Sequence, residues 1–154
     1  MQLYIIRHAH ALDAAEDAER PLSKRGRKQL RRLSRFLEKT DALQVPEIWH
    51  SPLARSKETA ELLKENLARD AKLVQVDGIE GEDDPAVIAN RLKTRRSALA
   101  LVGHEPHLSA LLSLLVAGAP EPRKFVLKKA ATVALERIDG HWAVRWHVSP
   151  EIIR

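Results

Sequence analysis

Short apolar segments alternate along the chain with longer segments in which apolar residues recur at helical spacing. Four of the short segments have the composition of buried strands, and these lie at residues 3–6, 45–50, 73–76 and 97–102. Two more apolar segments, at residues 132–135 and 142–146, flank Asp139-Gly140, a dipeptide that favours the tight turn of a β-hairpin. The pattern therefore predicts four strands separated by helices, followed by a hairpin.

The longer segments between the strands predict four helices. They cover, approximately, residues 24–38, 52–67, 85–93 and 108–116. Ser23 is the expected N-cap of the first helix, while Ser51 and Pro52 have the N-cap and first-turn pattern of a helix start. Strands that alternate with helices favour a largely parallel sheet covered on both faces. We therefore expect an α/β fold, a three-layer α/β/α sandwich with a mostly parallel central sheet, as a single domain over residues 1–154.

The composition is that of a folded protein rather than a disordered or membrane-spanning one. Apolar residues make up 44% and charged residues 31% of the 154 residues. The longest apolar segment, residues 108–118, is interrupted by Ser109 and Ser113 and is too short to cross a bilayer. Arg7 and His8 interrupt the N-terminal apolar run too early for a signal peptide. The absence of cysteine excludes disulfides, thiolate zinc sites and thiol nucleophiles, so we expect a cytoplasmic protein with no membrane partner.

The chain carries a formal net charge of +5, and much of the basic excess lies in the first predicted helix. Basic residues recur between Lys24 and Arg35, opposite a stripe of leucines. This arrangement is typical of the solvated face of an amphipathic helix, and it lacks the interleaved aromatic residues of a single-strand-binding surface. We therefore expect no nucleic-acid partner, and a role of this face in docking another partner stays open. Gly26, near the start of the helix, lowers helix propensity, which a close backbone contact there would explain.

Basic side chains follow three of the predicted strands at the point where each strand ends. Arg7 and His8 come directly after the first strand, Arg55 lies in the first turn after the second, and His104 follows the strand at 97–102. The carboxyl ends of parallel strands meet at one edge of a sheet. We therefore expect two arginines and two histidines to converge there.

These residue types suit the transfer of a phosphoryl group. Arginine side chains offer permanently charged planar forks that match phosphate oxygens. A neutral imidazole can act as the nucleophile that takes the phosphoryl group. A second, protonated imidazole can neutralise the charge that spreads over the phosphoryl oxygens in the transition state. This chemistry requires no metal ion, and we expect neither a metal site nor a cofactor.

Four segments resemble the signature segments of the histidine phosphatase superfamily, the phosphoglycerate-mutase-like group of enzymes. They are Arg7-His8-Ala9, the segments 51–60 and 102–106, and Pro21-Leu22-Ser23-Lys24-Arg25-Gly26. The resemblance is strongest to the small SixA-type phosphohistidine phosphatases and extends over essentially the whole chain. Ala9 departs from the pattern, because the superfamily usually has glycine at this position.

The resemblance implies a phosphoglycerate-mutase-like fold and a set of roles for the strand-end residues. It implies that His8 is phosphorylated during turnover and that Arg7, Arg55 and His104 hold the phosphoryl group.

The residue that would protonate the leaving group is not defined by the motifs. Larger relatives carry a glutamate before the fourth strand, and the corresponding segment here, residues 78–84, offers Glu80. Asp17, in the loop after the Arg7-His8 corner, is the other candidate acid. Each is better explained as an ordinary solvated loop carboxylate, so the sequence leaves both the identity and the existence of the acid open.

A weak or missing acid favours phosphohistidine as the substrate, because imidazole, with a pKa of about 6.5, leaves more readily than an alkoxide. The short segment between Arg55 and residue 97 also leaves no room for a subdomain that would cover the site. We therefore expect a phosphatase that acts on a phosphohistidine-bearing protein domain through a covalent phospho-His8 intermediate. One alternative is a phosphomonoesterase that acts on a small phosphorylated metabolite with the same mechanism. Another is a non-catalytic phosphate- or nucleic-acid-binding module.

Overall fold

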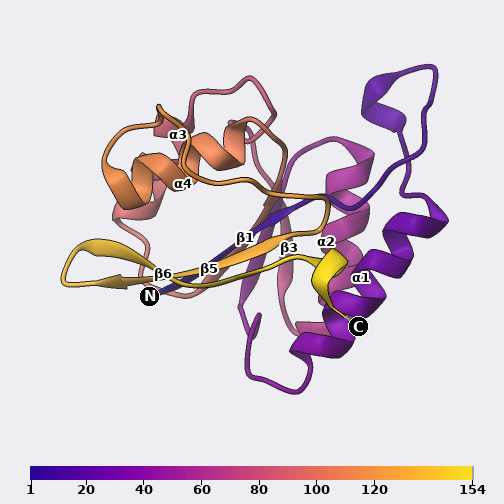
Figure 1. The fold of residues 1–154 in the computed structure, drawn as a ribbon, viewed down its shortest axis with the longest axis horizontal. Coiled ribbons are helices and arrows are strands. Elements are labelled where there is room, and N and C mark those ends of the chain that lie inside the picture. The colour runs from indigo at the N-terminus through magenta and orange to yellow at the C-terminus, as the bar shows by residue number, and fades with distance from the viewer. Residues whose placement is uncertain (154) are drawn as a thin grey trace.

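The computed structural model describes residues 1–153, in which a six-stranded sheet is covered by two helices on each face (Figure 1). The strands are β1 (Gln2–Arg7), β2 (Glu47–His50), β3 (Lys72–Gln75), β4 (Leu99–Gly103), β5 (Thr132–Ile138) and β6 (His141–Val148). The α-helices are α1 (Lys24–Leu37), α2 (Ala54–Leu67), α3 (Pro85–Lys93) and α4 (His107–Ala117). Two single-turn 3-10 helices, η1 (Asp17–Glu19) and η2 (Pro150–Ile152), complete the described elements.

The strand order across the sheet is β3-β2-β4-β1-β5-β6. The first four of these strands are mutually parallel, whereas β5 runs antiparallel to β1, and β6 antiparallel to β5. This confirms the predicted three-layer α/β fold with a mostly parallel sheet. The register pairs Arg7 with Gly103 and His50 with Val102, so β1, β2 and β4 end at the same level.

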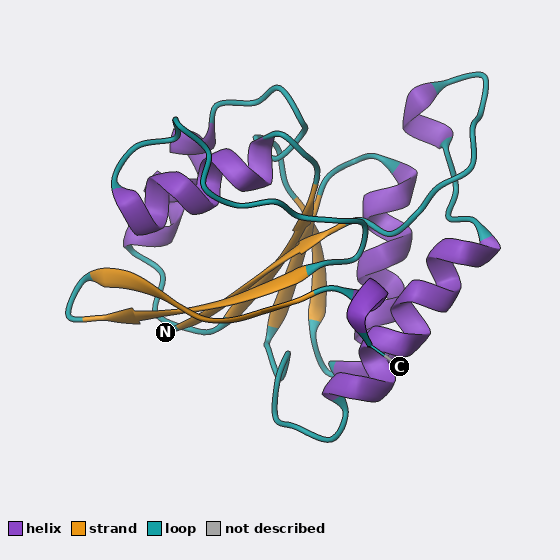
Figure 2. Cartoon of the chain, viewed as in Figure 1, coloured by secondary structure: helices purple, strands orange, loops and turns teal. Residues whose placement is uncertain are grey.

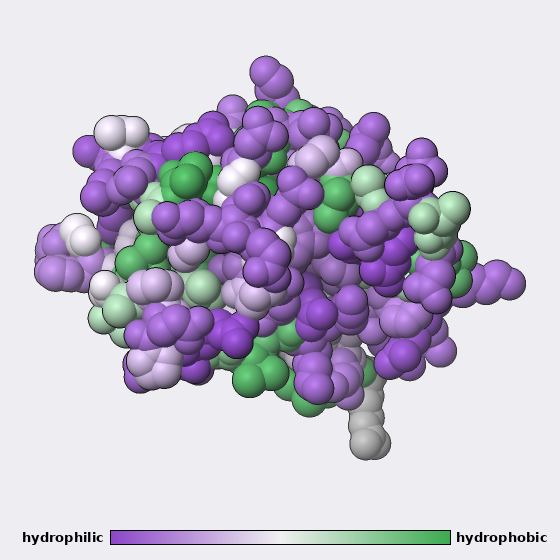
Figure 3. Space-filling view, turned by 90° about the horizontal axis from the view of Figure 1, so that it is seen from above, coloured by the Kyte–Doolittle hydropathy of each residue, from purple (hydrophilic) through white to green (hydrophobic). Residues whose placement is uncertain are grey.

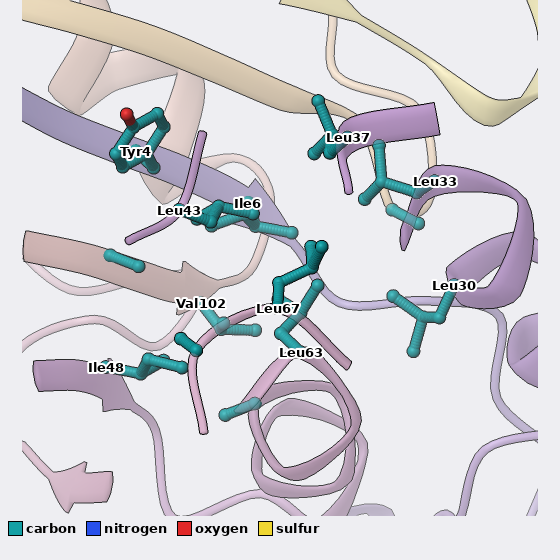
Figure 4. Close-up of a cluster of buried hydrophobic side chains, with 14 of the residues drawn as sticks. Tyr4, Ile6, Leu30, Leu33, Leu37, Leu43, Ile48, Leu63, Leu67 and Val102 are labelled. Atoms are coloured by element: carbon teal, nitrogen blue, oxygen red, sulfur yellow. The ribbon is translucent and has the colours of Figure 1, made fainter. Parts of the chain in front are cut away.

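Strand β1 is buried on both of its faces, which explains its uninterrupted apolar sequence. Tyr4 and Ile6 point into one hydrophobic cluster, formed with α1 and α2 (Figure 4). Leu3 and Ile5 point into a second cluster, formed with α3 and α4. Successive side chains of a strand alternate between the two faces of a sheet. Helices on both faces therefore require apolar residues at every position of the strand.

The start of α1 follows the sequence prediction, including the suspected close contact at Gly26. The Ser23 hydroxyl oxygen accepts a hydrogen bond from the Gly26 N–H at 3.0 Å, which confirms Ser23 as the N-cap. A Cβ atom on Gly26 would lie 2.1 Å from the carbonyl oxygen of His10. Only glycine lets the helix backbone come this close to the segment that follows β1.

The expected start of the second helix is wrong. Helix α2 begins at Ala54, with Leu53 as the N-cap, and not at Ser51 and Pro52. The Ser51 hydroxyl lies 2.6 Å from Nε2 of His104 and accepts a hydrogen bond from the Leu53 N–H. Ser51 is therefore part of a turn that contacts His104 at the carboxyl end of the neighbouring strand β4, and the helix begins three residues after Ser51.

The predicted hairpin is confirmed, with both turn residues at positive φ: 50° for Asp139 and 79° for Gly140. The loop between α4 and β5 runs back across the carboxyl ends of the parallel strands (Figure 2). The helices described within residues 1–153 are all too short or too polar to cross a membrane.

Candidate active site

The corner after β1 brings the two predicted histidines together. The His8 N–H donates to the Gly103 carbonyl at 3.0 Å and so extends the pairing of β1 with β4 by one residue. The His8 and His104 rings lie with their centroids 5.0 Å apart, and each residue is only 4% exposed. The Ala9 N–H donates to the Thr59 hydroxyl at 3.1 Å, so α2 also holds the corner in place.

The protonation of His8 is set by the backbone of the next residue. Its Nδ1 lies 2.8 Å from the Ala9 carbonyl oxygen. A carbonyl oxygen only accepts hydrogen bonds, so Nδ1 carries the ring proton and Nε2 keeps a free lone pair. Burial lowers the pKa of His8 to about 2; the bond to Ala9 opposes this shift, and the nearby charge of Lys129 adds to it. His8 is therefore a neutral imidazole with an available nucleophilic nitrogen at physiological pH.

His104 is also buried, and its pKa is lowered to about 3, first by burial and then by the Arg55 guanidinium, while Asp17 opposes the shift. This differs from the protonated second imidazole expected from the sequence, because the sequence does not show that the ring is desolvated. Ser51 occupies Nε2 of His104, and Nδ1 is buried without a hydrogen-bond partner among the described residues. A dianion beside this ring would raise its pKa, since an opposite charge favours the charged form.

The two predicted arginines reach the same edge of the sheet and are held by backbone carbonyls. Arg7 donates from Nη1 to the Leu127 carbonyl at 2.7 Å. Arg55, 8% exposed, donates from Nη1 to the Asp17 carbonyl at 2.9 Å and from Nη2 to the Asp17 carboxylate at 3.2 Å. Within residues 1–153, the Nε atoms of both arginines are buried and unpartnered. Together with Nδ1 of His104, three buried nitrogens at this edge thus lack a hydrogen-bond partner among the described residues.

The structure places the two candidate acids in different surroundings. The Arg55 guanidinium holds the pKa of Asp17 below its ordinary value, so this carboxylate is ionised where it lies. Glu80, in the loop after β3, is half-buried, and its backbone N–H donates to the Asp83 carboxylate at 2.9 Å. A Cβ atom on Gly81 would lie 2.9 Å from the Glu105 carbonyl oxygen, so the Glu80 loop packs against the turn that carries His104.

Lys129 joins the site although the sequence analysis did not single it out. The segment that contains it is hydrogen-bonded to the β1 corner, with the Ala130 N–H 3.1 Å from the Arg7 carbonyl oxygen. Burial, and then three neighbouring guanidinium groups, lower the pKa of the Lys129 ammonium to about 8; these groups belong to Arg7, Arg20 and Arg55. Lys129 lies before the antiparallel strand β5 and not after a parallel strand, so the strand-end pattern that predicts the other site residues does not include it. The one sequence signal is a lysine pair, Lys128-Lys129, beside a buried strand.

The site is built for an anion. Among residues 1–153, no group of three or more His, Asp or Glu side chains is arranged to hold a metal ion. Arg7, Arg55 and Lys129 instead concentrate positive charge around two neutral imidazoles. Buried guanidinium donors of this kind match the oxygens of a phosphoryl group.

Comparison with known proteins identifies the family. A family model described as the histidine phosphatase superfamily (branch 1) matches residues 3–80, just over half of the chain. The chain therefore belongs to the histidine phosphatase superfamily. It is 26% identical to the phosphohistidine phosphatase SixA of Escherichia coli (strain K12) in an alignment that covers 97% of this chain and 94% of that protein.

Solved structures confirm the fold over the whole chain. The structure of the protein histidine phosphatase SixA complexed with tungstate matches with a TM-score of 0.86 at 22% identity, covering 97% of each chain. The α-ribazole phosphatase of Shigella flexneri matches with a TM-score of 0.78 at 17% identity, also covering 97% of each chain. The protein thus has a SixA-like, phosphoglycerate-mutase-like fold.

Proposed function

We propose that this protein hydrolyses phosphohistidine on protein substrates through a phosphoryl group carried on His8. The observation that carries the proposal is the neutral His8, with Nε2 free, beside the unpartnered nitrogens of Arg7, Arg55 and His104. A nucleophile and a set of anion donors therefore share one buried corner. The similarity to SixA along the whole chain supports the same substrate class.

The first step transfers the phosphoryl group to His8. Nε2 of His8 attacks phosphorus, a new P–N bond forms, and the P–N bond to the substrate imidazole breaks. The substrate ring, protonated on its other nitrogen, keeps the electron pair of that bond and leaves as neutral imidazole. Attack through Nε2 makes the His8 ring cationic, and the Ala9 carbonyl, which accepts from Nδ1, stabilises that charge. Arg7 and Arg55 balance the negative charge on the phosphoryl oxygens.

The second step releases phosphate. Water attacks phosphorus, the P–N bond to His8 breaks, and orthophosphate leaves. The ring returns to its neutral form with its proton on Nδ1, and the proton lost by the water passes to solvent. The low pKa of His8 favours this return, because burial disfavours a cationic ring once the phosphoryl charge has left.

The surroundings of Asp17 support phosphohistidine over an alkyl phosphate. An alkoxide leaving group needs a proton donor, whereas Asp17, which contacts Arg55, has a lowered pKa and is ionised. An imidazole leaving group needs less help because its own pKa is about 6.5.

A phosphomonoesterase acting on a small metabolite is the second candidate function. The observation that favours it is the position of Glu80, whose loop packs against the turn that carries His104. Glu80 would then be the acid that protonates an alkoxide. The fold similarity to an α-ribazole phosphatase is compatible with this alternative.

The test measures phosphate release from a phosphohistidine-bearing protein and from a panel of alkyl and aryl phosphates. We expect fast release from phosphohistidine, slow ester hydrolysis, and a loss of at least about 10⁴-fold in His8→Ala for both. Mass spectrometry at alkaline pH should detect a phosphoryl group on His8 of the wild type during turnover. Turnover that does not depend on His8 would contradict the mechanism.

Two carboxylate variants separate the candidate functions. If the protein acts on phosphohistidine, Glu80→Gln and Asp17→Asn each change its hydrolysis by less than about tenfold. A preference for one metabolite ester, lost by about 10²-fold or more in Glu80→Gln, would instead establish the phosphomonoesterase and identify its acid.

A further inference from the structure

A basic groove lies next to the active site, between α1 and the C-terminal segment. Its volume is about 460 Å³, and its cationic lining residues are Arg25, Lys28, Arg32, Lys128 and Lys129. Glu151, on η2, is the acidic residue in the lining. Figure 1 shows η2 beside α1, so the groove is closed on one side by the C-terminal turn.

The α1 residues in the groove form one stripe of the helix. Arg25, Lys28 and Arg32 follow the spacing i, i+3, i+7, which places them on one face. Lys24, Arg31 and Arg35 are exposed on the same helix but do not line the groove. The basic face of α1 is thus divided between a groove wall and an ordinary solvated surface.

Lys129 links the groove to the active site. This side chain lines the groove, and its charge also acts on His8 and His104. Its backbone neighbour Ala130 donates to the carbonyls of the Arg7-His8 corner at 3.1 and 3.3 Å. A partner that contacts Lys129 in the groove would therefore lie beside the segment that is hydrogen-bonded to the corner carrying the nucleophile.

We propose that this groove binds an acidic segment that flanks the phosphohistidine in the protein substrate. The inference rests on the proposed function and names the kind of partner that the site takes. Five cations against one carboxylate favour an anionic occupant. The lining contains no aromatic side chain on which a base could stack, which favours an acidic polypeptide over single-stranded nucleic acid.

The groove lining agrees with an electrostatic rather than an apolar contact, since its residues are charged or polar except for Pro150. The face of the molecule seen from above in Figure 3 is predominantly hydrophilic, with hydrophobic residues scattered in small groups. Charges of this kind steer an oppositely charged partner and raise the rate of encounter. The groove should therefore act mainly on kcat/KM.

The experiment compares two synthetic peptides that carry one phosphohistidine, flanked on both sides by glutamates in one and by glutamines in the other. At low ionic strength, we expect the wild type to favour the acidic peptide by about tenfold in kcat/KM. The groove variant Arg25→Glu/Lys28→Glu/Arg32→Glu should reduce this ratio to about one or below. The matched variant Lys24→Glu/Arg31→Glu/Arg35→Glu, with the same change in net charge, should keep it.

The salt dependence of the wild-type protein tests the same proposal without any substitution. The wild-type preference should fall to about twofold or less near 0.5 M salt, because exposed charges are screened over a few ångströms there.

Several results would overturn the proposal. Equal turnover of the two peptides by the wild type would exclude the binding of an acidic segment in the groove, and it would leave the proposed function intact. An equal loss of preference in both triple variants would assign the effect to net charge. A further contrary result is a wild type that turns over the two peptides with a kcat/KM ratio near one and binds a labelled single-stranded RNA. If only the groove variant then lost the RNA binding, the groove would be assigned to nucleic acid. No turnover of either peptide by the wild type would remove the proposed function and the groove proposal with it.

Discussion

The candidate active site and the groove beside it are both basic, but their cations lie in different environments. Arg55 is 8% exposed and donates to a backbone carbonyl and a carboxylate, and Arg7 donates to the Leu127 carbonyl. Arg25, Lys28 and Arg32 are exposed on α1. Charges interact more strongly where water is excluded, and they are screened where it is not. The same residue types therefore suit phosphoryl transfer in one region and partner attraction in the other.

The two regions are mechanically joined at the start of α1. The Ser23 N–H donates to the His10 carbonyl, and Gly26 packs against the same carbonyl. Lys129 provides the electrostatic link, since it is half-buried and acts on both histidines. Substitutions in either region should show how strongly the packing at Gly26 and the charge of Lys129 couple the two regions.

Among changes that compare the two regions, the largest expected effect is the loss of the guanidinium at Arg55. Arg55→Lys keeps the charge but removes the planar fork, so we expect kcat/KM to fall by about 10²- to 10³-fold. In the groove, Arg25→Lys should leave the preference for an acidic peptide within about twofold, because exposed sites depend on charge alone. If Arg55→Lys lowered kcat/KM by only about twofold, burial would not distinguish the arginines of the two regions.

Gly26→Ala should break the mechanical link. The new Cβ would meet the His10 carbonyl oxygen at 2.1 Å, and relief requires one backbone to move. We expect a loss of about 2–4 kcal/mol in the free energy of unfolding, measured in urea. The matched change Lys28→Ala, at an exposed position of the same helix, should stay within about 0.5 kcal/mol. Comparable stability of the two variants would argue against a tight contact at Gly26.

Ser51 should act as a positioning residue through His104. Ser51→Ala removes the 2.6 Å contact with Nε2, so we expect kcat to fall by about 10- to 100-fold with little change in KM. Ser34→Ala serves as the control, because Ser34 is also buried but has no hydrogen-bond partner among the described residues. A rise in KM at constant kcat would instead indicate a role in binding.

Lys129 should give the smallest of these effects, visible in the pH profile. Its pKa is lowered to about 8, so the ammonium is charged below that pH and loses its charge as the pH rises through it. We expect kcat/KM of the wild type to fall by about tenfold above pH 8. Lys129→Arg should move this limb to higher pH, since arginine stays charged. Lys128→Arg should leave the fall of kcat/KM above pH 8 unchanged. If this fall stayed at the same pH in Lys129→Arg, it would report the titration of another group.

Much of the fold and four residues of the site follow from the sequence alone. The alternation of apolar strands with helical segments predicts the parallel sheet. Arg7 and His8 lie at the carboxyl end of β1, His104 directly follows β4, and Arg55 lies in the first turn of α2, after β2. They meet because parallel strands end at one edge, and the pairing of Arg7 with Gly103 sets the two histidines side by side. Gly26 could also be interpreted before its contact was known, because glycine is unfavourable inside a helix.

The remaining features depend on contacts between segments that are far apart in the chain. Ser51 has the pattern of a helix cap, but it lies against His104, 53 residues away. Lys129 enters the site only because its segment pairs with the end of β1, and the groove exists only because η2 packs beside α1. Periodicity predicts elements and their faces, whereas the packing of loops against strand ends is a tertiary property. The pKa values of both histidines belong to this second group, since burial is their largest cause.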